Sequence, residues 1–244
     1  MRTRTFSLIG GLSIPLMACS AANAGLVLIF DDGSGLSAEA EFTLLGAGDV
    51  LEIRLKNIST SIPNGFGASD QLLTGISWDF GHIGFNGDVM ITGGTVATGS
   101  SSSSINFSIS NVGPNSDVSG EYGYGNMDGT GALPNFVSGN AAQAIPFGGA
   151  NLDGPVVING PQAGLLSSLA SISLGGLGAI QDEIITTLSL SEALISESEI
   201  IGLLGEARVE FGSDAHFIQI PIPTPGSMAP LCLAGIFAWR RRRR

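Results

Sequence analysis

Within Val50-Leu51-Glu52-Ile53-Arg54-Leu55-Lys56-Asn57, the apolar residues Leu51, Ile53 and Leu55 alternate with the charged residues Glu52, Arg54 and Lys56, a period of two. Neighbouring side chains of a β-strand point to opposite faces, so this pattern predicts a strand whose leucine and isoleucine side chains are buried and whose charged side chains meet water. Antiparallel sheets commonly have one buried face and one solvated face. The stretch therefore predicts an antiparallel sheet that packs on one side only.

A weaker alternation precedes this strand at Ala38–Leu44, and Gly46-Ala47-Gly48-Asp49 between the two segments is typical of a hairpin connection. Many short strands at this spacing favour an all-β class, and we predict one antiparallel β-sandwich-like domain over residues 25–220. The other predicted strands are Leu26–Phe30, Gly75–Phe80, Val89–Val96, Ile105–Ser110, Ser168–Leu174, Ile184–Leu190, Ala207–Phe211 and His216–Ile220.

Three segments interrupt the strand pattern. The five serines of Ser100–Ser104 predict a mobile turn. Gly113–Gly154 is rich in Gly, Asn and Pro and predicts long loops with little regular structure. Ser191–Leu204 carries the capping-box pattern Ser196-x-x-Glu199 and apolar residues on one face, so we predict one short helix there.

Residues 1–24 have the pattern of a secretory signal peptide. Met1-Arg-Thr-Arg4 is positively charged, an apolar stretch follows, and the small residues Ala22 and Ala24 precede Gly25. A signal peptidase requires small residues at these two positions, so we predict cleavage between Ala24 and Gly25. An alternative stays open, because Leu16-Met17-Ala18-Cys19 resembles a lipoprotein cleavage box that would leave the cysteine lipidated.

Residues 221–244 join three segments of different physical character. The prolines of Pro221-Ile-Pro-Thr-Pro-Gly-Ser227 favour an extended strip. Met228–Trp239 carries no charge, and as a helix it would span about 18 Å, short of the ~30 Å hydrocarbon core. An interfacial aromatic ring and a cytoplasmic cluster of cations complete a transient membrane stop, and these residues are Trp239, Arg240, Arg241, Arg242, Arg243 and Arg244.

This order of signal peptide, acidic β-rich body, proline-led motif, short apolar helix and arginine cluster resembles the PEP-CTERM class of exosortase-dependent surface proteins. The class usually has Pro-Glu-Pro where this sequence has Pro223-Thr224-Pro225-Gly226, so the exosortase variant that recognises the tail stays open. The resemblance implies processing by signal peptidase and by an exosortase near the proline strip. It also implies membrane anchoring before that cleavage, then a place at the cell surface or in the extracellular matrix, with surface polysaccharide as a candidate partner.

The net charge of the predicted body limits the classes of partner that we expect it to bind. All 21 acidic residues lie between Asp31 and Asp214, and only Arg54, Lys56 and Arg208 oppose them, which leaves residues 25–220 with a formal charge of −18. Such a surface repels phosphates, so nucleic acid is excluded as an expected partner. Both cysteines lie in the segments predicted to be removed, so the body has no disulfide framework.

Few residue patterns point to chemistry. The sequence has no nucleophile-elbow, Walker or zinc-protease motif, and no motif supports either histidine as a catalytic base, so we expect no catalytic residues and no cofactor. Asp31-Asp32-Gly33-Ser34-Gly35 is a weak structural calcium candidate, because hard cations take carboxylate and hydroxyl oxygens. The same residues are also typical of an ordinary turn.

Three aromatic residues, Trp78, Tyr122 and Tyr124, are weak candidates for glycan binding, since aromatic faces beside carboxylates can hold sugars. Trp78 alternates with Ile76 and Phe80, however, which favours burial in a strand. We therefore expect a non-catalytic exported surface protein. The alternatives are a glycan- or calcium-dependent adhesive module with the same sorting route and, less strongly, a secreted hydrolase.

Overall fold

The described part of the protein is built from strands. The computed structural model describes residues 25–60, 72–79, 91–107, 112–126, 133–141, 143–149, 152, 158, 160–167, 178–193, 204–213 and 216–221. Within these ranges there are fourteen strands and no helix, so the mostly β class is confirmed. No helix among these residues is long and apolar enough to cross a membrane. The predicted signal peptide, the strand at 168–174, the residues of the tail beyond Pro221 and most of the predicted helix at 191–204 lie outside the described residues.

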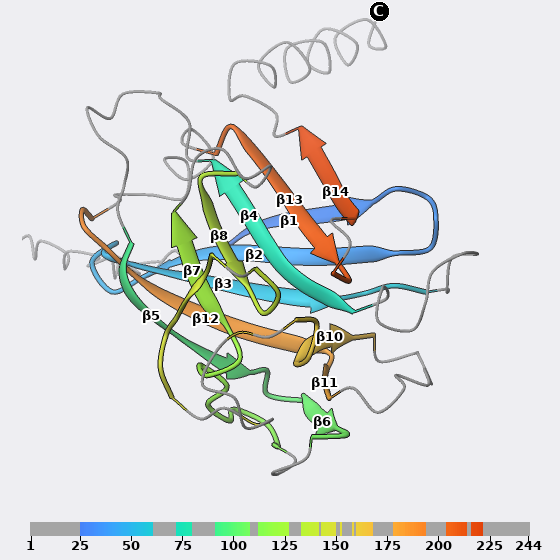
Figure 1. The fold of residues 1–244 in the computed structure, drawn as a ribbon. Helices are drawn as coiled ribbons and strands as arrows, with labels where there is room; N and C mark the ends of the chain where they lie inside the picture. Colours follow the sequence, from blue (N-terminus) through green and yellow to red (C-terminus); the bar gives the residue numbers. More distant parts are fainter. Residues whose placement is uncertain are drawn as a thin grey trace, which may run out of the picture.

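The first sheet has five strands and is antiparallel throughout, with the order β1-β2-β3-β12-β5 (Figure 1). The predicted hairpin joins β2 to β3, with Leu45 opposite Val50. Gly46 and Gly48 take φ values of 63° and 90°, which a glycine adopts without steric cost. The bounds of these strands are β1 Leu26–Asp31, β2 Ser37–Leu45, β3 Val50–Asn57, β12 Glu183–Leu190 and β5 Ile91–Thr98.

The second sheet has nine strands, which follow the path β6-β11-β10-β4-β8-β7-β9, with β13 paired to β4 and β14 paired to β13. One pair, β10 with β11, is parallel and departs from the antiparallel prediction. The bounds are β4 Leu73–Asp79, β6 Ser103–Ile105, β7 Gly123–Asn126, β8 Asn135–Ser138, β9 Ile145–Pro146, β10 Gly164–Leu166, β11 Ala179–Gln181, β13 Glu206–Phe211 and β14 His216–Pro221.

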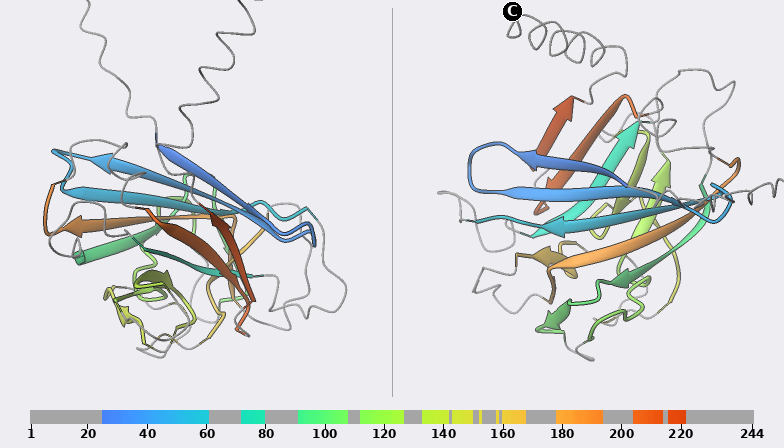
Figure 2. Two further views of the ribbon diagram at one scale, coloured as in Figure 1. Left: turned by 90° about the horizontal axis from the view of Figure 1, so that it is seen from above. Right: turned by 180° about the vertical axis from the view of Figure 1, so that it is seen from behind.

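The two sheets share one hydrophobic core. Leu51, Ile53 and Leu55 of β3 pack in the same cluster as Trp78 of β4 and Val209 of β13. Figure 2 shows the first sheet on one side of this core and β13 with β14 on the other. β3 and β13 bury alternate side chains, so the residues between them point to the outside of the body, whereas all residues of Leu73–Trp78 in the central strand β4 are buried.

Two loop predictions hold only in part: Ser100 and Ser101 lie in a turn, and most described residues of 113–154 belong to no strand, but each segment also contributes to the second sheet. Ser103 and Ser104 belong to β6, where they pair with Gln181 and Ile180 of β11, because serine in an extended backbone can take part in a ladder as any residue can. The predicted loop Gly113–Gly154 contains the short strands β7, β8 and β9 of the second sheet. Its glycines allow close packing: a Cβ on Gly125 would lie 2.0 Å from the Phe136 ring.

Candidate functional site

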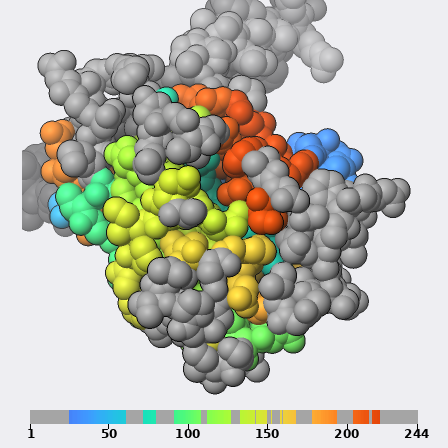
Figure 3. Space-filling model, in the orientation of Figure 1, coloured from blue at the N-terminus to red at the C-terminus, as the bar shows by residue number. Residues whose placement is uncertain are grey.

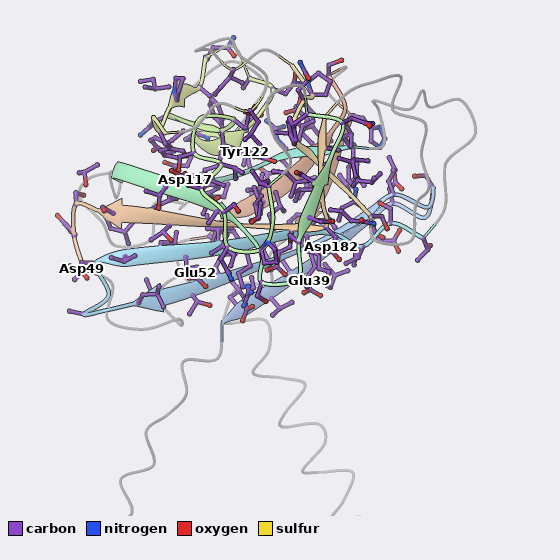
Figure 4. All side chains as sticks on the ribbon, turned by 90° about the horizontal axis from the view of Figure 1, so that it is seen from below. Glu39, Asp49, Glu52, Asp117, Tyr122 and Asp182 are labelled. Carbon is purple, nitrogen blue, oxygen red and sulfur yellow. The ribbon has the colours of Figure 1, made fainter. Side chains whose placement is uncertain are left out.

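The aromatic residues singled out for glycan binding face the core. Trp78 and Tyr122 have no exposed surface, and the Tyr122 side chain lies inside the body in Figure 4. The Tyr122 hydroxyl donates a hydrogen bond to the carbonyl oxygen of Ala163 at 2.6 Å, and burial raises the pKa of this hydroxyl. Neither ring can stack on a sugar from outside, so the glycan assignment of these two residues is wrong.

Tyr124 is also part of the packing. Its side chain packs against the core cluster on the same side of the sheet as Val137, its cross-strand partner. Its hydroxyl donates to Asn135 Oδ1 at 2.7 Å. The three predicted aromatics therefore do not form a binding surface together.

The calcium candidate forms a turn between β1 and β2. Asp31 Oδ1 accepts the backbone N–H of Gly33 at 2.7 Å, and Asp32 Oδ1 accepts that of Ser34 at 2.8 Å. Asp32 Oδ2 also lies 3.3 Å from His216 Nε2. Partial burial opposes ionisation of Asp32, but the Ser34 hydrogen bonds and His216 outweigh it and hold its pKa below the ordinary value. These contacts are those of an ordinary turn, and the described residues contain no group of three potential metal-ligating Asp, Glu, His or Cys side chains.

The predicted processing residues lie at or beyond the ends of the described fold. Gly25 directly precedes β1, and β14 ends at Pro221. The other residues of these two sites are outside the described ranges: Ala22, Ala24, Pro223, Thr224, Pro225, Gly226, Trp239 and Arg240–Arg244.

The outer face of the first sheet holds two of the three cations of the body. Arg54 Nη2 lies 2.8 Å from Glu183 Oε1, and Lys56 Nζ lies 3.6 Å from Asp182 Oδ2. The hydrogen bond to Glu183 raises the pKa of Arg54. Other carboxylates are spread along the sheet, as Figure 4 shows for Asp49, Glu52 and Glu39. This face is a solvated set of ion pairs without a converging site.

The outer face of the second sheet holds the third cation, Arg208 of β13. Ala207 and Val209 point into the core, so Arg208 points outward between them. Its Nε–H donates to Ser77 Oγ of β4 at 3.2 Å, and its guanidinium carbon lies 4.4 Å from the ring centroid of Phe217 on β14. Three strands thus fix one arginine, and atoms of β13 and β14, coloured orange and red, reach the surface on this side in Figure 3.

Two glutamates of β13 share this face with Arg208. Glu206 and Glu210 are two residues away on either side, and the negative charge of each favours the charged form of Arg208, which acts to raise its pKa. Burial lowers the pKa of Arg208 despite them. Burial likewise raises the pKa of Glu210. Two effects oppose this rise: a hydrogen bond from Asn140 Nδ2 to Glu210 Oε1 at 3.4 Å, and the charge of Arg208. The result is a half-buried donor between two acceptors, an arrangement suited to binding a polar ligand.

Sequence reasoning missed this group of residues, although part of the signal was present. The alternation in 206–211 indicates that Arg208 points away from the core. The ring that covers it, Phe217, and its hydrogen-bond acceptor, Ser77, come from two other strands, and nothing in the linear sequence gives their register.

No family model matches this chain, and neither the curated proteins nor the solved structures contain a match to it.

Proposed function

We propose that this chain is an exported, non-catalytic surface protein. A signal peptidase removes residues 1–24, and an exosortase cleaves near Pro223–Pro225 after the C-terminal segment has held the chain briefly in the membrane. The delivered body is a β-sandwich-like domain of residues 25–220 at the cell surface or in the extracellular matrix.

The observation that carries the proposal is the position of the first and last strands. β1 begins at Leu26 and lies at an edge of the first sheet, and β14 ends at Pro221 and pairs, among the described residues, with β13 alone. Cleavage outside either strand therefore leaves every described backbone ladder intact. A domain whose ends leave from edge strands can lose both termini without loss of its core.

The charge distribution supports an outward-facing role. The body carries a formal charge of −18, and Arg54 and Lys56 are engaged in ion pairs on the first sheet. A high net charge of one sign keeps a protein soluble and disfavours association with anionic polymers. The partners expected from this route are the two processing enzymes and, transiently, the membrane.

Intact mass spectrometry of envelope-extracted protein tests the proposal. The wild-type mass should correspond to a chain that starts at Gly25 and ends near Pro223–Pro225, with any adduct resolved. A Pro223→Ala/Pro225→Ala variant should retain Trp239 and the terminal arginines, whereas Asp49→Asn in the β2–β3 hairpin, the matched control, should be processed as wild type. Wild-type envelope protein that still carries Trp239 and the arginines would refute the proposal.

A further inference from the structure

Two contacts hold the guanidinium of Arg208 in place, but only one of its N–H groups donates a hydrogen bond within the described residues. Ser77 Oγ accepts its Nε–H, and its guanidinium carbon lies over the Phe217 ring. Within the described part of the chain, no acceptor bonds the four N–H groups of its two terminal nitrogens. An arginine has five donors in a fixed planar fork, so four of the five have no partner among the described residues and can donate to a ligand.

Fixing this side chain in advance favours binding. A free arginine side chain loses rotamer entropy when a ligand immobilises it, and this loss opposes binding. Here the cation–π contact with Phe217 and the hydrogen bond to Ser77 have already restricted the side chain. The half-buried position also strengthens hydrogen bonds to a ligand, since water competes less there.

Acceptors and a further amide surround the fork. Glu206 and Glu210 lie two strand residues away on either side, about 6.7 Å along β13. Gln219, directly opposite Arg208 on β14, is exposed. Donors and acceptors therefore alternate along the strand and continue across it from β4 to β14.

The charges on this face select the class of ligand. Arg208 is the only Lys or Arg of the second sheet, while Glu206, Glu210 and the Asp79 opposite Glu206 are acidic. Three carboxylates around one guanidinium disfavour an anionic ligand, even though an isolated arginine fork would suit one. Hydroxyl groups, which donate and accept at once, fit alternating Glu, Arg and Gln side chains.

We propose that the outer face of β13 and β14, centred on Arg208, binds a neutral polysaccharide. The terminal N–H groups of Arg208 donate to sugar oxygens, and Glu206 and Glu210 accept sugar hydroxyls. Gln219 extends the contact across the sheet, so the site fits a chain of sugars better than a single one. This inference is independent of how the protein is exported and processed.

Affinity electrophoresis with the full-length protein, in a detergent that contains no sugar, tests the site. The native gels contain neutral polymers (dextran, amylose, laminarin or galactomannan) or the acidic polymers alginate and heparin. We expect at least one neutral polymer to retard the wild-type protein and the acidic polymers not to retard it. For Arg208→Gln, we expect a dissociation constant at least ten times larger than that of the wild type. Arg54→Gln removes a cation from the opposite sheet and should bind as wild type.

A second variant separates loss of binding from loss of folding. Gln219 is exposed, so Gln219→Ala should leave the unfolding transition unchanged and weaken binding about threefold or more. Absence of retardation by all four neutral polymers would overturn the proposal. Retardation by alginate or heparin alone, or unchanged binding by a folded Gln219→Ala or Arg208→Gln variant, would overturn it as well.

Discussion

The ring of Phe42 on β2 meets the ring of Trp78 on β4 edge-on, with centroids 6.1 Å apart and planes at 78°. Both side chains are fully buried, and each comes from a different sheet. The contact therefore joins the two sheets within their shared core. Edge-to-face pairs of this kind stabilise a fold by more than the burial of their apolar surface alone would.

Truncation of either ring should cost much of the stability of the domain. We expect Phe42→Ala and Trp78→Ala each to lower the free energy of unfolding by about 3–5 kcal/mol, with a coupling of about 0.5–1.5 kcal/mol in the double-mutant cycle. Urea unfolding measures both quantities. Val27→Ala, at a half-exposed position of β1, is the control and should change stability by less than about 0.5 kcal/mol. Fully additive single effects would show that the rings do not interact.

Two glycines in strands give a matched pair of opposite predictions. A Cβ on Gly125 would lie 2.0 Å from Phe136 Cζ, whereas a Cβ on Gly93 of β5 would meet no atom within 4 Å. Gly125→Ala should therefore destabilise by about 1–3 kcal/mol through overpacking. Gly93→Ala should be neutral or stabilise by up to about 1 kcal/mol, because it restricts the unfolded chain. Equal melting temperatures for the two variants would contradict this account.

The sequence was most informative where strands are long and one face is wet. The alternation in Val50–Asn57 predicted β3 with its observed bounds, and the glycines of 46–49 predicted the hairpin that fixes its register to β2. Both signals are local: side-chain period and turn chemistry lie within a few residues of the structure they specify.

Short strands held by distant partners could not be predicted in this way. β6, β10 and β11 have three residues each, too few for a period to appear. Their positions depend on pairing between Ser103–Ile105 and Ala179–Gln181, some 75 residues apart in the chain. The candidate site has the same limitation, since the contact from Arg208 to Ser77 spans 131 residues.

The ion pair between Arg54 and Glu183 should contribute little to the free energy of unfolding. Their side chains are 37% and 16% exposed, and pairs near the surface typically contribute about 0.2–1 kcal/mol. We expect a coupling in that range from the cycle of Arg54→Gln and Glu183→Gln, measured by urea unfolding at low salt. The coupling should shrink in 1 M NaCl, where the Debye length is about 3 Å. The Lys56 and Asp182 cycle, with a separation of 3.6 Å, is the comparison and should give a smaller value.

Glu210 should make the domain less stable as the pH rises. Burial raises the pKa of Glu210 in the folded state above the ordinary value of 4.5, which holds in the unfolded state. At a pH between the unfolded-state pKa and the folded-state pKa, the folded state binds more protons than the unfolded state. The free energy of unfolding therefore falls as pH rises through this window, and the penalty is absent below it. Glu210→Gln removes the titration and keeps an oxygen to accept the Asn140 hydrogen bond.

The difference in unfolding free energy between Glu210→Gln and wild type should become more positive from pH 4 to pH 7. Urea unfolding at several pH values measures it. Glu206→Gln removes one negative charge from the same face of β13 and controls for the change in net charge. A Glu210→Gln difference that stays constant or decreases with pH would mean that the buried environment does not disfavour the carboxylate. The partly desolvated surroundings inferred for Arg208 beside it would then need revision, since both side chains share that face.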